Sequence, residues 1–129
     1  MPNPIVINVP ITQANTTLYI MADTYAAFTQ QVSIQVPNGQ PLVATGNGEG
    51  KRVGYWTLSF PTVGIYTFSV LVQYNSGSGY QNSSLVQQAQ LGAVTLNQIV
   101  VFSEDANDND DNDCLITFMW FNRPQAARQ

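Results

Sequence analysis

Residues 53–74 read VGYWTLSFPTVGIYTFSVLVQY, and this stretch determines the class of fold. Before the turn signal PTVG, large apolar residues alternate with Thr and Ser; after it, Phe and Val alternate with Thr, Ser and Gln. A period of two residues is typical of strands that bury one face and expose the other. The stretch therefore predicts two half-buried strands, 53–60 and 64–74, joined by a tight turn.

The same alternation continues on both sides of this hairpin, and no segment has the 3.6-residue period of an amphipathic helix. Further turn signals are PNGQP at 37–41, GNGEG at 46–50 and NSGSG at 75–79. About nine strands are expected, near residues 4–10, 16–22, 29–36, 41–45, 53–60, 64–74, 83–89, 95–102 and 114–121. Short strands with tight turns predict one all-β domain, an antiparallel β-sandwich over 1–123, followed by a tail extension at 124–129.

The composition excludes several classes of function. The net charge is −4, and Lys51, Arg52, Arg123 and Arg128 are the only cations, so no basic patch is available and nucleic acid is not an expected partner. There is no histidine, which removes the usual general base and the commonest zinc ligand. The single cysteine, Cys114, is expected to be a buried thiol. An enzyme is not expected.

The N-terminal sequence MPNPIVINVP lacks the basic region and apolar core of a signal peptide. No apolar run is long enough to span a bilayer. We therefore expect a protein that is cytoplasmic as synthesised and does not insert into membranes, with release or cell-surface display by a non-classical route as a further option.

One segment, SEDANDNDDNDC at 103–114, contains six of the eight acidic residues. Carboxylates this crowded repel one another unless a cation compensates them. A solvated hairpin tip is one interpretation, but the mixture of Asp, Asn and Glu oxygens favours calcium. An EF-hand is excluded because Asp113 stands where Gly is needed and Met119 where Glu is needed. The flanking strands are apolar on both faces, which predicts that the segment joins two central strands.

Together with the following apolar strand that ends near Trp120, the segment resembles the calcium loop of the two-calcium bacterial lectins of the LecB type. The resemblance implies a nine-stranded sandwich, two calcium ions per chain and direct coordination of fucose or mannose hydroxyls by calcium. The implied function is calcium-dependent carbohydrate binding without catalysis. We also expect a homodimer or higher oligomer, because several weak sugar sites act together through avidity.

The resemblance also assigns roles to residues of the acidic segment. Glu104, Asp108, Asp110 and Asp113 resemble the ligands of one calcium ion, and Asp110 and Asp113 also bridge to the second ion. The remaining assignments are Asn112 as a ligand of the second ion, Asp105 as a hydrogen-bonding partner of the sugar and Asp111 as a solvent-facing residue.

Weaker similarity covers ANTTLYIMADTYAAFTQQVSIQV at 14–36. It puts Tyr25 where the family offers a backbone carbonyl to calcium, and it puts Ala26, Ala27 and Phe28 on the loop that sets sugar preference. Phe28 either stacks on an apolar sugar face or points into the core. If the alignment allows a two-residue insertion, Asp23 becomes the calcium ligand instead.

The C-terminus departs from the family pattern. There the chain stops three residues after the Trp, and its terminal carboxylate reaches the calcium of a partner subunit. Here Arg123 occupies that position and six residues follow. Either the tail bends away or the dimer is assembled differently. The alternative function is a structural or assembly β-sandwich that keeps calcium for stability but has lost sugar binding.

Overall fold

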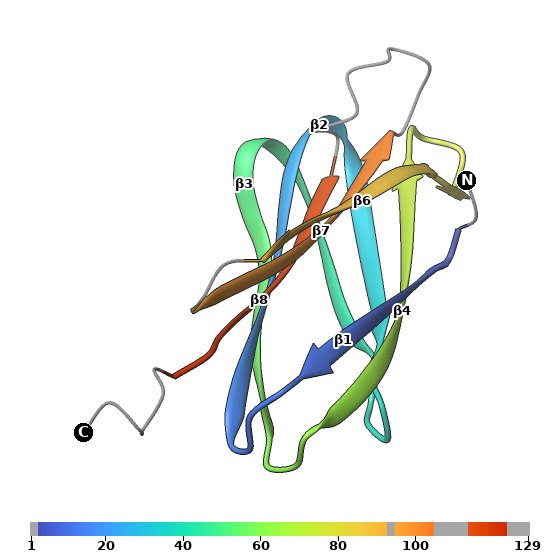
Figure 1. Cartoon of the computed structure of the whole chain (residues 1–129). Helices are drawn as coiled ribbons and strands as arrows, with labels where there is room; N and C mark the ends of the chain where they lie inside the picture. The colour runs from blue at the N-terminus through green and yellow to red at the C-terminus, as the bar shows by residue number, and fades with distance from the viewer. Residues whose placement is uncertain (1–2, 93–94, 105–113, 124–129) are drawn as a thin grey trace.

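The computed structural model describes residues 3–92, 95–104 and 114–123 of the chain (Figure 1). All helical or strand structure in these ranges is β-strand, and all strand pairings are antiparallel. These observations confirm the predicted all-β single domain. The strands are β1 (Ile5–Ile11), β2 (Thr16–Gln35), β3 (Leu42–Phe60), β4 (Gly64–Asn75), β5 (Tyr80–Asn82), β6 (Ser84–Gly92), β7 (Leu96–Glu104) and β8 (Cys114–Phe121). Within these described ranges, no helix is long and apolar enough to cross a membrane.

The described part of the chain forms eight strands where about nine were expected, because two predicted breaks are absent and one short strand, β5, was missed. The predicted strands 16–22 and 29–36 are both part of β2, and the predicted strands 41–45 and 53–60 are both part of β3. The turn predicted at 46–50 was therefore wrong. Gly48 and Gly50 adopt φ angles of 116° and 63°, which other residues avoid, and they let β3 kink without leaving its partner.

The two layers of the sandwich belong to one continuous sheet, ordered β1-β4-β2-β8-β7-β6, with β3 paired to β2 and β5 paired to β4. The first half of β2 pairs with β8, from Leu18↔Trp120 to Thr24↔Cys114. Its second half pairs with β4. The long strand β2 thus passes from the layer that contains β8 to the layer that contains β4. Figure 1 shows β6 and β7 crossing the long strands diagonally.

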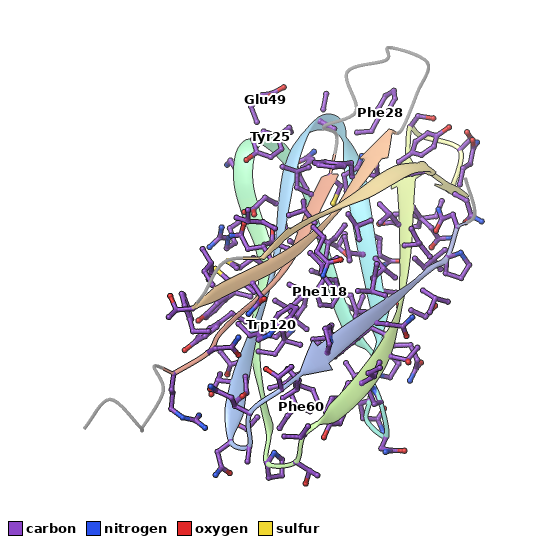
Figure 2. All side chains as sticks on the ribbon, viewed as in Figure 1. Tyr25, Phe28, Glu49, Phe60, Phe118 and Trp120 are labelled. Carbon is purple, nitrogen blue, oxygen red and sulfur yellow. The ribbon has the colours of Figure 1, made fainter. Side chains whose placement is uncertain are left out.

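The core lies between the layers and is built from alternate residues, as the period of two predicts. In β1, for example, every second side chain is buried. Phe68 of β4 contacts Phe118 of β8 edge-on, with ring centroids 5.3 Å apart, and this contact joins the two layers. Figure 2 shows Phe118 and Trp120 in the middle of the molecule. Cys114 is also fully buried, as expected.

Candidate functional site

The acidic segment connects two neighbouring strands, as the sequence predicted. β7 and β8 are adjacent, and their register ends at the pair Ser103↔Cys114. The hydroxyl of Ser103 donates a hydrogen bond to the carbonyl of Cys114 at 3.3 Å, and both residues are fully buried. The two ends of the segment are therefore fixed to each other at one end of the sandwich.

Most of the predicted calcium ligands fall outside the described residues. Glu104 is the last residue of β7, where its backbone pairs with Ser84. The residues that lie outside the described ranges are Asp105, Asp108, Asp110, Asp111, Asn112 and Asp113. In the ranges that the structure does describe, no three His, Cys, Asp or Glu side chains come together in a way that could hold a metal ion.

The other predicted site residues lie at the same end of the sandwich. The β2–β8 pairing stops at Thr24↔Cys114, so β2 continues past the start of β8 with Tyr25, Ala26, Ala27 and Phe28. Figure 2 shows Tyr25 and Phe28 at this upper end. Ala26 is buried, Tyr25 is half-buried, and Ala27 and Phe28 are exposed. The structure therefore brings these four residues to the end from which the acidic segment leaves β7.

The segment Tyr25–Phe28 is held against β3 by specific contacts. Tyr25 pairs with Glu49 directly after a register shift between Thr24 and Tyr25, and a further bulge interrupts the ladder between Ala26 and Gln30. The hydroxyl of Thr24 donates to the carbonyl of Gly48 at 3.0 Å, and the side-chain amide of Asn47 donates to the carbonyl of Ala27 at 3.4 Å. Ala27 and Phe28 lie within this bulge, and both are exposed.

Asp23 forms an ion pair with Arg52 of the same chain. Arg52 Nε and Nη2 donate to the two carboxylate oxygens of Asp23 at 2.8 and 3.2 Å. The hydrogen bond that Arg52 donates to the Asp23 carboxylate is the main reason that the pKa of Arg52 is raised above its ordinary value. Both carboxylate oxygens of Asp23 thus accept hydrogen bonds from Arg52. Which of the two alignments, the one that uses Tyr25 or the one that uses Asp23, supplies the calcium ligand stays a prediction.

Phe28 does not point into the core. Its ring stacks on Tyr74 of β4 with centroids 5.9 Å apart and an interplanar angle of 21°, and 38% of the residue stays exposed. Tyr74 was not predicted as a site residue. It continues the alternating pattern of Phe68, Val70 and Val72, and nothing local in the sequence signals that β4 brings it to Phe28.

Arg123 docks on the opposite end of the sandwich. Its guanidinium donates to the carbonyls of Ala14 and Asn15 at 2.8 and 3.3 Å. Its backbone exchanges two further hydrogen bonds, of 2.7 and 3.0 Å, with the side chain of Gln13. Residue 123 is thus held by the turn between β1 and β2 of its own chain.

Comparison with known proteins gives a family and several structures with a similar fold. A family model described as Fucose-binding lectin II (PA-IIL) matches residues 7–122. The high-affinity mannose-binding lectin of Ralstonia solanacearum is 30% identical and superimposes with a TM-score of 0.70, over 94% of this chain and 96% of that one. Chromobacterium violaceum lectin CV2L, solved in complex with alpha-methyl-fucoside, is 27% identical with a TM-score of 0.70 over the same shares.

A more distant structure supports the fold alone. The C-terminal domain of the BC2L-C lectin from Burkholderia cenocepacia is 19% identical and superimposes with a TM-score of 0.67, over 95% of this chain and 98% of that one. The search of curated protein sequences gives no match.

The fold and these matches define the class of protein, which is a carbohydrate-binding lectin built on a β-sandwich. The chain belongs to the PA-IIL fucose-binding lectin family. The family that the acidic segment indicated is thereby confirmed.

Proposed function

We propose that this lectin binds fucose- or mannose-type monosaccharides through calcium ions held by the segment between β7 and β8. The family match over residues 7–122 supports the sugar class, because the Ralstonia relative is a mannose-binding lectin and CV2L was solved with a fucoside. Support for calcium comes from the charges and donor atoms of the chain itself.

The observation that carries the proposal is an imbalance of charge at one end of the sandwich. Six acidic residues lie in the segment, while the chain has four cations. Arg52 is bound to Asp23, and Arg123 is bound at the opposite end. Within the described ranges this leaves Lys51, a single positive charge, near the site. Divalent ions that prefer oxygen ligands fit this donor set.

In the proposed site, Glu104, Asp108, Asp110, Asn112 and Asp113 and the backbone carbonyl of Tyr25 supply oxygen ligands. Calcium, when bound, would coordinate the oxygens of sugar hydroxyls directly. Asp105 accepts a hydrogen bond from a sugar hydroxyl and so orients the ring. Ala26 and Ala27 have small side chains, which leave room for the sugar beside the β2 backbone, and Phe28 borders that space.

Isothermal titration calorimetry tests this function. Methyl α-fucoside and methyl α-mannoside are titrated into the full chain in calcium and, separately, after treatment with EDTA. We expect binding of at least one glycoside in calcium and its loss after chelation. Unchanged binding in EDTA would overturn the role of calcium. No sugar binding in calcium, combined with a large calcium-dependent rise in Tm, would favour the structural or assembly alternative.

The proposed lectin is a homodimer, and the outer face of β2, β8 and β7 is the surface that supports it. On this face Tyr19 contacts Phe121 edge-on at 6.2 Å, and Phe121 is 49% exposed. The outward-facing apolar residues are Tyr19 and Met21 of β2, Leu115, Met119 and Phe121 of β8, and Leu96, Val100 and Phe102 of β7. Among the residues of this face whose side chains the structure describes, Asp23 carries a charge, and Arg52 pairs with it. A neutral apolar face of this kind suits a second copy of the same chain.

A further inference from the structure

Phe28 and Tyr74 form an aromatic pair, which we call the platform, beside the proposed sugar site. The two rings are nearly parallel, with centroids 5.9 Å apart. Tyr74 lies against the Phe28 ring in an offset stack, while 38% of Phe28 remains exposed. An aromatic ring that packs on a neighbour and stays partly exposed offers a flat apolar surface to a ligand.

The platform also has a polar edge. The hydroxyl of Tyr74 donates a hydrogen bond to the side-chain carbonyl of Gln81 at 3.0 Å. This bond uses the proton of the hydroxyl but leaves its oxygen as an acceptor, and it leaves the amide nitrogen of Gln81 as a donor toward solvent. Tyr74 and Gln81 are register partners in the β4–β5 pair, so β5 fixes this edge relative to the ring.

Pyranose sugars have the matching chemistry. One face of the ring carries apolar C–H groups that stack on an aromatic ring, and the rim carries hydroxyls that pair with amide and hydroxyl groups. Phe28 follows Ala27 in the chain, about 3.3 Å further along the strand. A second ring linked to a sugar bound at Ala26 and Ala27 therefore has the platform within its reach.

We propose that Phe28, Tyr74 and Gln81 form a second sugar subsite, which holds the pyranose ring linked to the terminal sugar. This inference rests on the proposed function, since it requires a terminal sugar at the neighbouring site. With this subsite the protein recognises disaccharide units. It prefers the glycosidic linkage that places the second pyranose ring against Phe28.

The test compares disaccharides with monosaccharides by isothermal titration calorimetry of the full chain in calcium. The probes are methyl α-mannoside with the α1-2, α1-3 and α1-6 mannobioses, and methyl α-fucoside with fucosyl-N-acetylglucosamine disaccharides. We expect at least one disaccharide to bind more tightly than its monosaccharide. Phe28→Ala should reduce that ratio of affinities by about 2- to 10-fold, the range expected for one stacking contact.

Two further variants separate the platform from general effects on folding. Tyr74→Phe keeps the stacked ring but removes the polar edge, so it should lower the ratio less than Phe28→Ala. Tyr80→Ala is the matched control, because Tyr80 is 41% exposed but lies one position from Gln81, on the other face of the same strand. The control should leave the ratio unchanged.

The outcomes distinguish the subsite from the proposed function. Equal losses of monosaccharide and disaccharide affinity in Phe28→Ala would overturn the subsite while leaving sugar binding intact. Wild-type protein that binds monosaccharides but gains nothing from any disaccharide would do the same. If wild-type protein binds none of these probes in calcium, the proposed function fails, and the subsite fails with it.

Discussion

Arg52 binds both carboxylate oxygens of Asp23 across the β2–β3 pair, with Nε 2.8 Å from Oδ1 and Nη2 3.2 Å from Oδ2. The pair sits at the first register shift of β2, between Ala22 and Asp23, two residues before Tyr25. The two strands stay together through three successive irregularities, and this ion pair is the side-chain link at the first of them. It links β2 to β3 just before the segment Tyr25–Phe28, and we call this ion pair the clamp.

Removing the clamp should weaken sugar binding more than it weakens the fold. In Arg52→Gln we expect the free energy of unfolding to fall by no more than about 1 kcal/mol, because the Arg52 side chain is 53% exposed and water screens the pair. Sugar affinity should fall several-fold, because the segment that borders the sugar loses one of the contacts that hold it on β3 and keeps the bonds to Gly48 and Asn47. Urea unfolding and calorimetry measure the two effects.

Lys51→Gln is the matched control, since it removes the same charge from the neighbouring residue without breaking the ion pair. A similar drop in sugar affinity for both variants would mean that net charge, and not the clamp, is responsible.

The strands were predictable because each layer of the sandwich buries one face. A period of two in the sequence therefore indicates which side chains of a strand lie in the core. The continuity of β2 and β3 was not predictable from local signals. Gly46, Gly48 and Gly50 suit a turn as well as a kinked strand, and only the long pairing with β2 decides between them. The stacking of Phe28 on Tyr74 also depends on the pairing of distant strands.

The position of the acidic segment was predictable for a different reason. Its two flanking strands are strongly apolar, and in the structure they are neighbours that close at Ser103 and Cys114. The predicted ligand set from Asp105 to Asp113 lies outside the described residues and stays a prediction. Variants of those residues test it directly.

Chelation of calcium should destabilise the protein. A ligand that binds only the folded state stabilises it by about 2.7 kcal/mol when its concentration is 100 times its Kd. For a chain of 129 residues this corresponds to a fall in Tm of roughly 5 to 15 °C when EDTA is added. Differential scanning calorimetry measures the change. A Tm that is identical in calcium and in EDTA would contradict a calcium site in this chain.

The two aspartates at 110 and 111 provide a matched pair for the calcium ligands. The family resemblance assigns Asp110 to both ions and turns Asp111 to solvent. Asp110→Ala should therefore lower the number of calcium ions bound per chain, whereas Asp111→Ala should keep it, although both variants lose one negative charge. Calcium titration by calorimetry gives the stoichiometry. Wild-type stoichiometry and affinity in Asp110→Ala would show that the bridging assignment is wrong.

The contacts of Arg123 should contribute modestly to stability. Arg123→Ala removes the two hydrogen bonds from its guanidinium to the carbonyls of Ala14 and Asn15 but keeps the backbone bonds with Gln13. We expect a loss of about 0.5 to 1.5 kcal/mol in the free energy of unfolding, measured in urea. Arg123→Lys keeps the charge but not the planar fork, and it should recover only part of the loss. An unchanged midpoint in Arg123→Ala would mean that the docked guanidinium adds nothing to stability.

The outer face of β2, β8 and β7 should control the oligomeric state. Phe121→Lys puts a charge on this face where Phe121 contacts Tyr19, and burying an unpaired charge against a second copy is costly. We expect the dimer Kd to rise about 10-fold or more in sedimentation velocity experiments. Val6→Lys is the control, because Val6 is a 54% exposed apolar residue on the other layer, in β1. Equal weakening by both substitutions, or a wild-type protein that is monomeric at high micromolar concentration, would rule out this face as the dimer interface.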